Sequence, residues 1–388
     1  MHLIEVTSAA HIKSFLDSPT ALYKDHPNWI RPLDNDIEKT FNPKLNPNFR
    51  DGAAIRWILQ DDQGQTIGRV AAFVNGKTKN ASEYVTGGMG FFECIHDQAA
   101  ANMLFDACQK WLADQGMEAM DGPINFGERD RFWGLLVNGF TEPNYGMFYH
   151  PPYYQELFEN YGFQVYFKQY TYRRDPEAKL SDKIHQRAAL LLKDPALSFK
   201  HVSKKNMEKL TQEFLEVYNK AWAGHSGLNE MTLDKARKLI NSMKPIMDEK
   251  LIYFAYYHDQ PISFFIMLPE LNQIFKHLHG KLDWLGKLKF LYYRWQYNHK
   301  PRKKALGLIF GVIPEFQGKG IDSYMSVMSQ KAVLAQGVGQ VEMNWIGDFN
   351  PKMMMVVRGL EAVIYKTHHT YRKIFDPSKP FTRYPIIK

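Results

Sequence analysis

The chain has 388 residues, of which 45% are hydrophobic and 23% charged, and its formal net charge is +8. These proportions are typical of folded globular proteins and exclude a mainly disordered chain. At a usual size of ~150 residues per domain, the length predicts two or three domains. With only two cysteines the chain has no disulfide framework, and a structural zinc site would depend mostly on histidine.

The charge is divided unevenly along the chain. Residues 1–175 contain 16 Lys and Arg against 22 Asp and Glu, whereas residues 176–388 contain the remaining 33 against 19. A polyanionic ligand is therefore expected on the second half. The opposite net charges also indicate two units that attract each other.

The first residues lack the basic start and apolar stretch of a signal peptide. The most apolar segment, residues 251–268, is interrupted by His258, Asp259 and Pro261 before it could span a bilayer. We therefore expect a cytoplasmic protein without a transmembrane segment.

The first half predicts strands and helices in a mixed order. A proline-rich arm at residues 17–51 is expected to contain no long regular element. Asp97 is a good helix N-cap, and apolar residues recur after it at helical spacing. The predicted strands cover residues 54–60, 66–75, 88–95, 118–122 and 163–172, and the predicted helices cover residues 97–115 and 153–161.

The second half repeats this order of elements, which indicates an architectural duplication. Its predicted helices cover residues 182–192, 204–221, 233–243, 284–297, 321–336 and 351–359. Its predicted strands cover residues 251–257, 262–268, 306–313, 340–346 and 362–375. We predict a first domain at residues 1–175, a connector at 176–200 and a second domain at 201–388.

The most specific pattern lies at residues 307–323, GLIFGVIPEFQGKGIDS. A buried strand runs into Pro314, and the glycine turn at residues 317–320 leads directly into a helix. Glycines at such a junction let the backbone approach a ligand closely, and the helix N-terminus supplies free N–H groups and partial positive charge. The junction therefore suits a pyrophosphate, although it has neither Walker nor dinucleotide-binding spacing.

At these residues the chain resembles the GNAT acyltransferase superfamily, whose acyl-CoA signature is Gln/Arg-x-x-Gly-x-Gly/Ala. Gln317, Gly320 and Asp322 fall on its three fixed positions, and Asp322 departs from the family's Gly or Ala. A carboxylate next to bound phosphates is unfavourable unless it turns away and caps the helix. The resemblance implies that acyl-CoA is bound by Ile313, Gln317, Gly318, Lys319, Gly320, Ile321, Asp322, Ser323 and Asn350.

A second GNAT-like motif follows at residues 342–362. Asn350 matches the family's asparagine at the cofactor cleft, whereas Val357 replaces the tyrosine that can protonate the departing thiolate. Residues 144–163 resemble the same motif in the first half, but residues 93–97 (ECIHD) stand where the glycine turn would be. The resemblance therefore predicts an α+β protein of two tandem GNAT-like domains. Each domain is expected to have a mixed, mostly antiparallel sheet flanked by helices, and the first to be a degenerate copy.

The resemblance also implies the chemistry. An amine attacks the acyl thioester directly between two splayed strands, here residues 308–313 and 341–346, and no metal is needed. A backbone N–H on the first strand can bind the developing oxyanion, and a base must accept a proton from the attacking ammonium. Glu342 is the candidate catalytic base, with Asp348 behind it. The structural alternative for Glu342 is a solvated or hydrogen-bonded carboxylate at the start of a strand.

The expected function is therefore N-acylation, with acetyl-CoA or another acyl-CoA as donor and a small-molecule or peptide amine as acceptor. One alternative is an aminoacyl-tRNA- or fatty-acyl-dependent transferase of the Fem or myristoyl-transferase type, for which tRNA or lipid would be a partner. Another is a catalytically inactive GNAT-like binding protein.

Two further segments carry charge next to aromatic residues. Residues 276–304 hold nine Lys and Arg against Asp283 alone, with Trp, Leu and Tyr at helical spacing. This basic amphipathic helix suits a membrane surface, a tRNA phosphate track or the CoA phosphates, but we expect its apolar stripe to pack on the acidic first half. In the loop at residues 127–133, Arg131 or Trp133 would line an interdomain cleft if the loop is functional.

Overall fold

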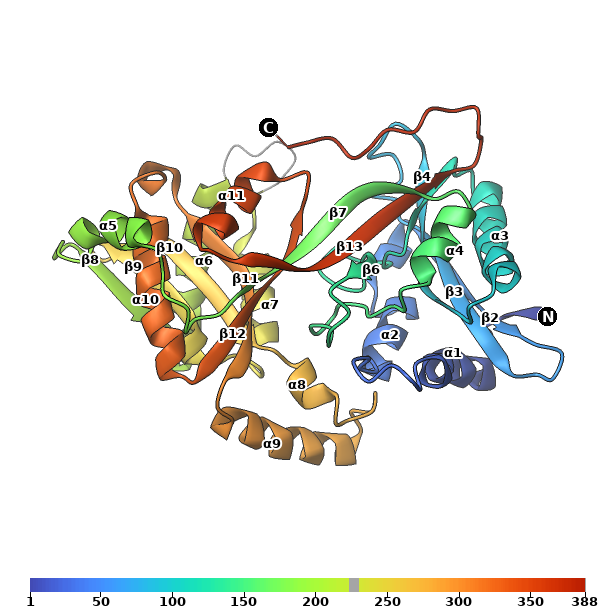
Figure 1. Ribbon diagram of the computed structural model, residues 1–388, viewed down its shortest axis with the longest axis horizontal. Helices are drawn as coiled ribbons and strands as arrows, with labels where there is room; N and C mark the ends of the chain where they lie inside the picture. The colour runs from blue at the N-terminus through green and yellow to red at the C-terminus, as the bar shows by residue number, and fades with distance from the viewer. Residues whose placement is uncertain (223–229, 388) are drawn as a thin grey trace.

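The computed structural model describes residues 1–222 and 230–387. The described strands form one 13-stranded sheet in the order β1-β2-β3-β4-β5-β13-β7-β12-β11-β10-β9-β8, with β6 paired to β13. Figure 1 shows two lobes joined by the long strands β7 and β13. Among these strands the β4–β5 and β11–β12 pairs are parallel and the other pairs are antiparallel. The predicted class, a mixed and mostly antiparallel sheet flanked by helices, is confirmed.

The predicted elements of the first half are present to within a few residues, and β1, β6, α1 and α2 are additions. The strands are β1 (His2–Glu5), β2 (Ala53–Gln60), β3 (Thr66–Val74), β4 (Thr86–Cys94), β5 (Ala119–Gly122), β6 (Leu135–Asn138) and β7 (Gln164–Arg174). The helices are α1 (Ala9–Leu22), α2 (Asp34–Phe41), α3 (Gln98–Asp114) and α4 (Tyr154–Asn160).

The second half agrees similarly, with β8 and α8 as additions. The strands are β8 (Leu197–His201), β9 (Ile252–Tyr257), β10 (Gln260–Pro269), β11 (Lys303–Val312), β12 (Val338–Gly347) and β13 (Val363–Ile374). The helices are α5 (Asp182–Leu191), α6 (Met207–Trp222), α7 (Leu233–Met243), α8 (Asn272–Phe275), α9 (Trp284–His299), α10 (Ile321–Ala335) and α11 (Pro351–Gly359).

The two halves exchange their last strands. β7, the last strand of the first half, pairs with β12 of the second half, with Val341 opposite Arg174. β13, the last strand of the chain, pairs with β5 of the first half, with Tyr371 opposite Gly122. β7 and β13 also pair with each other, so the exchange makes both halves parts of one continuous sheet.

The proline-rich arm contains more helix than its composition predicts. α1 runs through Pro19 to Leu22, and α2 follows. Proline cannot donate the backbone hydrogen bond that would satisfy the Phe15 carbonyl. Arg69 Nη1 donates to that carbonyl at 2.6 Å instead, and Arg69 is paired with the buried Glu93. A tertiary contact that the local pattern does not reveal thus lets the helix continue, and the loop prediction for this arm is wrong in part.

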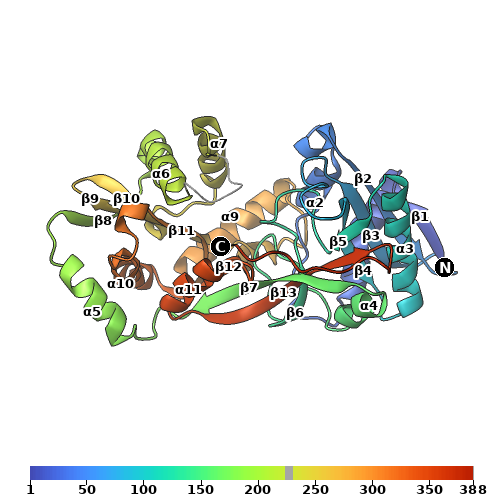
Figure 2. The same cartoon turned by 90° about the horizontal axis from the view of Figure 1, so that it is seen from above.

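Helices cover both faces of the second half's sheet. α6 and α7 pack on one face through Phe214, Val217 and Ile240, and α10 and α11 pack on the other through Val333 and Val357. Figure 2 shows these two layers on opposite sides, with α5 next to α10. Side chains on one face of β11 and β12 therefore point toward α6 and α7, and those on the other face point toward α10 and α11.

The expectation that the basic helix packs its apolar stripe on the first half is wrong. α9 lies at the edge of the molecule (Figure 1) and is fixed by its opposite face, where Phe290, Tyr293 and Tyr297 pack against Phe275 and Leu278 of the α8 region. The helix carries apolar residues on two faces, and the pattern alone cannot say which of them is buried.

Candidate functional site

Strands β11 and β12 diverge as the GNAT resemblance predicts. They pair in parallel from Lys303 opposite Val338 to Gly307 opposite Met343. Beyond this point β11 continues its pairing with β10, whereas β12 continues with β7. Leu308, the first residue after the last pair, is 40% exposed. The divergence leaves a wedge between the two strands that opens toward the glycine turn.

The glycine turn joins the end of β11 to α10. Gly318 and Gly320 have φ values of 71° and 86°, which side chains with a Cβ adopt only with strain. Gln317 Nε2 donates to the Val312 carbonyl at 2.9 Å and closes the turn. No described side chain caps α10. The N–H groups of its first turn are therefore available to an anion, and the residues present fit the pyrophosphate of acyl-CoA.

The other predicted cofactor residues surround this turn. Gln317, Gly318 and Lys319 are exposed, Gly320 and Asp322 are half-buried, and Ile313, Ile321 and Ser323 are buried. Asn350 lies across the wedge, where its side chain accepts from the Met353 amide at 3.1 Å and caps α11. The structure therefore places the N-termini of α10 and α11 after the two diverging strands.

The corresponding region of the first half is closed. After β5 the chain turns back, and the Ile124 amide donates to the Met89 carbonyl of β4 at 2.8 Å. A Cβ on Gly90 would lie 1.8 Å from the Ile124 carbonyl oxygen, so no ligand fits between them. Asp97 accepts from the Ala100 amide at 2.7 Å and caps α3. Of the two halves, the second has the open wedge and the uncapped helix.

An apolar cavity lies at the closed end of the wedge, on the α10 side of the sheet. Its cavity volume is about 60 Å³. The connector covers it, because Gln330 of α10 donates to the carbonyls of Pro176 and Ala178 at 2.7 and 2.9 Å. Its walls include Phe265 and Met267 of β10, Ser329 and Val333 of α10, and Val341 and Met343 of β12.

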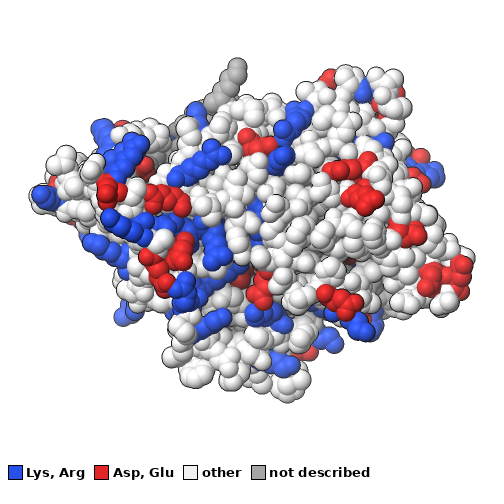
Figure 3. Space-filling model, viewed as in Figure 1, with Lys and Arg blue, Asp and Glu red and all other residues white. Residues whose placement is uncertain are grey.

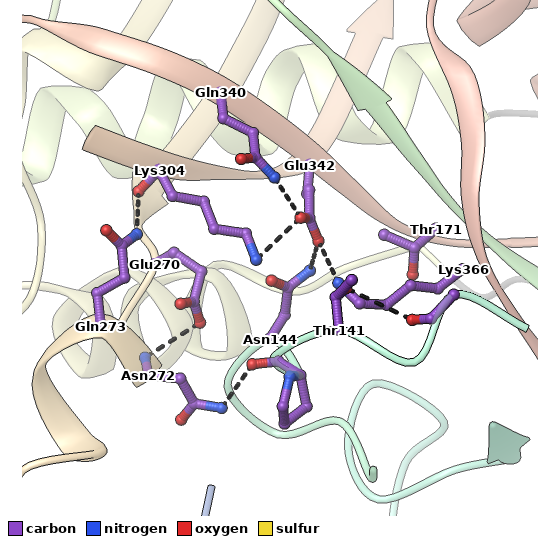
Figure 4. Close-up of polar contacts among 12 residues, drawn as sticks. Thr141, Asn144, Thr171, Glu270, Asn272, Gln273, Lys304, Gln340, Glu342 and Lys366 are labelled. Atoms are coloured by element: carbon purple, nitrogen blue, oxygen red, sulfur yellow. Dashed lines mark hydrogen bonds and ion pairs between the residues drawn. The ribbon is translucent and has the colours of Figure 1, made fainter. Parts of the chain in front are cut away.

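Glu342 occupies the opposite face of β12 and is completely buried. Its two carboxylate oxygens meet four donors from both halves of the chain (Figure 4). Oε1 accepts from Lys304 at 2.9 Å and from Gln340 at 2.6 Å. Oε2 accepts from Lys366 at 2.9 Å and from Asn144 at 2.7 Å. We call Glu342 with these four partners the interdomain cluster.

Burial and charge act in opposite directions on this cluster. Burial alone would raise the pKa of Glu342, but the ammonium groups of Lys366 and Lys304 outweigh it and hold the pKa below its usual value. Burial lowers the pKa of Lys366 to about 8, although Glu342 opposes the change. Glu342 is therefore ionised at neutral pH, and Lys366 titrates near physiological pH.

A second buried carboxylate, Glu270, extends the cluster. It follows β10 and accepts from the amides of Tyr145 at 2.8 Å and Asn272 at 3.1 Å. Burial raises its pKa, although Lys304 acts in the opposite direction. Glu270 thus links the first half at Tyr145 to the segment that leads into α8 and α9. Sequence reasoning did not find Glu270, Lys304, Lys366 or Asn144. Lys366 and Asn144 reach Glu342 only through the exchange of β7 and β13 and the docking of the halves, whereas Lys304 and Glu270 reach it through the pairing of β10, β11 and β12 within the second half.

Asp348 lies apart from Glu342, near the other end of β12. It accepts from the Lys168 amide at 3.1 Å and from Arg383 at 2.6 Å, and so it fastens the chain's last segment to β7. The loop at 127–133 also reaches this region, where the Arg129 carbonyl accepts from Trp345 Nε1 at 2.7 Å. The loop therefore contacts the second half through Arg129.

Two negative findings apply to residues 1–222 and 230–387. They contain no group of three or more His, Cys, Asp or Glu side chains that could hold a metal ion. None of their helices is long and apolar enough to cross a membrane.

No family model matches the chain, but two bacterial proteins are similar over nearly its full length. A protein named bacterial ceramide synthase from Caulobacter vibrioides (strain NA1000 / CB15N) is 27% identical over 379 residues, which cover 96% of this chain and 97% of the relative. Protein YghO of Escherichia coli (strain K12) is 25% identical over 375 residues, which cover 93% and 92%.

Solved structures establish the fold. A tandem GNAT protein from the clavulanic acid biosynthesis pathway has a TM-score of 0.53 at 10% identity and covers 97% of this chain and 99% of its own. A GCN5-related N-acetyltransferase from Sphaerobacter thermophilus has a TM-score of 0.51 at 11% identity, with 97% and 96% covered. The chain therefore has the tandem GNAT fold, as its motifs predict.

Removing the charge of Glu342 will destabilise the protein in a pH-dependent way. Glu342→Gln removes the carboxylate that directly contacts the ammonium groups of the buried Lys366 and the largely buried Lys304, and we expect a loss of ~3–5 kcal/mol in the free energy of unfolding at pH 7. The folded pKa of Lys366, about 8, lies below its unfolded value of about 10.4. Stability should therefore rise with pH between these values in both proteins. The deficit of the variant should narrow as the pH rises toward about 8, because the loss of Glu342, which opposes the lowering of the Lys366 pKa, lets Lys366 lose its proton at a lower pH in the variant.

Urea denaturation at several pH values measures both effects. Glu315→Gln is the matched control, because Glu315 is an exposed carboxylate in the same half, and its substitution should change the free energy of unfolding by less than ~0.5 kcal/mol. A Glu342→Gln deficit no larger than that of the control would contradict the role given to the interdomain cluster.

Proposed function

We propose that this protein is an acyl-CoA-dependent N-acyltransferase whose second half binds the donor. The observation that carries the proposal is the open wedge between β11 and β12, which ends at the uncapped N-terminus of α10. A ligand with a pyrophosphate and an extended arm fits such a site, because the helix end binds the anion while the unpaired edge of β11 can hydrogen-bond the arm. The closed first half supports a single donor site.

In this proposal the residues of the glycine turn bind the donor's phosphates. The amides of residues 318–323 and the positive end of α10 would face the pyrophosphate, with Lys319 adding charge. Ile313 and Asn350 would border the arm. The bound donor supplies a thioester whose carbonyl carbon is open to attack by an amine.

The apolar cavity supports a donor with an acyl chain longer than acetyl. It begins at Met343, where β11 and β12 stop pairing, so a chain extending beyond the thioester would enter it. Apolar walls stabilise methylene groups by about 0.8 kcal/mol each. The similarity to a protein named ceramide synthase favours a fatty-acyl chain and a long-chain amine as acceptor.

The reaction requires a proton to leave the acceptor. After losing its ammonium proton, the nitrogen attacks the carbonyl carbon, the C–N bond forms and the C–S bond breaks. The second proton that the nitrogen gives up as the amide forms goes to the departing thiolate, so CoA leaves as the thiol. We assign Lys366, in its neutral form, as the group that accepts the acceptor's ammonium proton, and Glu342 as the carboxylate that stabilises the resulting lysine cation. Support comes from the pKa of Lys366, about 8, because a base works best when its pKa is close to the working pH. Glu342, the base expected from the sequence, thus acts through Lys366.

A matched pair of substitutions at Gly318 tests the donor site. A Cβ there meets no atom within 4 Å, and Asn and Asp adopt the left-handed conformation with less strain than most other side chains. Gly318→Asp adds a negative charge next to the phosphates and should weaken CoA binding at least ~10-fold relative to Gly318→Asn. Isothermal titration with CoA measures the difference. Equal affinities would contradict binding at this turn, and no binding by the unsubstituted protein would favour the inactive GNAT-like alternative, with Asp322 as the reason.

Filling the cavity should shorten the preferred donor chain. Ser329 lines the cavity, and its buried hydroxyl makes no hydrogen bond. Ser329→Met should lower kcat/KM for long-chain acyl-CoA by ~10–100-fold and leave short-chain donors nearly unchanged. Ser378→Met, at an exposed position near the C-terminus, is the control. An equal loss of kcat/KM for donors of all chain lengths would show that the acyl chain does not bind in the cavity.

Lys366 should control the pH profile. Below the Lys366 pKa of about 8 the side chain is protonated and cannot accept a proton, so kcat/KM should rise with pH through this value. Lys366→Met should remove the rise and lower kcat/KM by ~10²–10⁴-fold. Repeating the pH profile with acceptors of different amine pKa shows whether the titrating group belongs to the enzyme or to the acceptor. A rise in kcat/KM that shifts with the pKa of the acceptor would overturn the assignment. Lys352→Met, at an exposed position, should keep the normal profile.

A further inference from the structure

Helix α9 exposes a continuous stripe of large apolar side chains. Six residues at helical spacing are between 49% and 69% exposed. They are Trp284, Leu285, Leu288, Leu291, Tyr292 and Trp295. At about 100° per residue they fall on one side of the helix. Isolated exposed apolar residues are ordinary, but a contiguous patch of this kind marks an interaction surface.

The opposite side of α9 holds the helix on the protein. Phe290, Tyr293 and Tyr297 pack in the small core that also contains Phe275. The Tyr297 hydroxyl donates to the Lys304 carbonyl at 2.8 Å, and Asp283 caps the helix through the Gly286 amide at 2.8 Å. The exposed stripe is therefore held on a fixed, formed helix and points away from the rest of the molecule.

Basic residues flank the stripe on both sides. By helical position, Lys287 lies along one border and Lys289 along the other, and Lys281 and Lys300 lie just beyond the two ends. Arg294 lies on the same side as Lys287 but is half-buried, and its guanidinium donates to the Pro245 carbonyl. The lower edge of the surface in Figure 3, where Figure 1 places α9, is mostly white with Lys and Arg next to it. The apolar stripe and its basic borders face in the same general direction.

We infer that α9 binds this protein to the surface of an anionic lipid bilayer. A helix that presents Trp, Tyr and Leu between lysines lies in the plane of the interface, with its apolar face ~5–10 Å below the headgroups. The lysines add attraction to anionic lipids. Aromatic residues favour this depth because their rings are apolar and their N–H or O–H groups reach water.

Charge distinguishes the bilayer from two other occupants. A second copy of this chain that covered the stripe with its own stripe would bring Lys287 and Lys289 of each copy close to those of the other, and like charges repel. A nucleic acid would be met by the basic borders, but its phosphates would face the six apolar side chains, which give it no partner. An anionic bilayer provides both apolar depth and surface charge.

The position of α9 connects this surface to the interdomain cluster. The segment that contains α8 and α9 leaves the sheet after Glu270 and returns at Lys304, where the Glu270 amide donates to the Lys304 carbonyl at 3.1 Å. Lys304 also contacts Glu342. A protein bound through α9 would therefore hold this cluster on the membrane side of its sheet. The inference goes beyond the proposed reaction and does not depend on it.

Co-sedimentation of the full-length protein with vesicles tests the inference. We expect binding to vesicles of phosphatidylcholine with phosphatidylglycerol, weaker binding to phosphatidylcholine alone, and a decrease with salt. Leu288→Glu with Leu291→Glu places two charges in the stripe and should weaken binding about 100-fold. Lys287→Glu with Lys289→Glu should remove the preference for phosphatidylglycerol.

The matched control is Leu190→Glu with Leu192→Glu, because both leucines are exposed at the end of α5, away from α9; it should bind vesicles as the unsubstituted protein does. Circular dichroism confirms that each variant is folded. The inference is overturned if the unsubstituted protein does not sediment with vesicles, if the Leu288/Leu291 variant binds equally, or if phosphatidylglycerol does not increase binding.

If the unsubstituted protein forms a dimer without lipid and the Leu288/Leu291 variant is a monomer, a second copy of the chain covers the stripe. Acylation of a water-soluble amine, measured in parallel without vesicles, keeps failure of this inference separate from failure of the proposed reaction.

Discussion

The carboxylate of Glu342 is removed from water, and a buried charge is tolerated only if opposite charge and hydrogen bonds surround it. Lys304 comes from the neighbouring strand, whereas Asn144 and Lys366 come from the first half and from the exchanged strand β13. Glu342 therefore requires both halves to be docked and both closing strands to be exchanged. The same docking sets the position of β12, and β12 forms one wall of the wedge in which we place the donor.

The local sequence pattern was sufficient to predict most helices and strands, but not which strands pair with each other. The helices that begin at Gln98 and Ile321 follow from an Asp97 cap and a glycine turn, both of which are short-range signals. β13 pairs with β5 of the first half, and this pairing depends on contacts between residues more than half of the chain apart. If β13 stayed within the second half, its alternation of apolar residues would be the same, so the sequence pattern cannot distinguish the two arrangements. Pro19 shows the same limit, since the Phe15 carbonyl that it leaves without its helical donor accepts a tertiary hydrogen bond from Arg69 in addition to a local one from the Ser18 hydroxyl.

The site was predictable to a similar extent. The glycine turn and Asn350 were identified through their resemblance to a family motif, and the structure places them after the two diverging strands. Lys366 carried no signal, because a lysine in a strand is ordinarily solvated and only the exchange buries it against Glu342. In α9 the sequence showed that the helix has an apolar stripe, but two apolar faces compete for the core. Phe290, Tyr293 and Tyr297 fill the space next to α8, and the other face is left outside.

The exchange of closing strands also affects how the protein is synthesised. Chains generally fold domain by domain from the N-terminus as they emerge from the ribosome. Here β5 obtains its inner neighbour only when residues 363–374 have been made, so the first half leaves the ribosome with an open sheet edge. During this interval β7 is also without β12 and β13. Unpaired edges of this kind favour association with other chains. The β5 edge of the nascent first half therefore stays open until β13 has been translated, and the exchange lengthens the interval in which this half can associate with other chains.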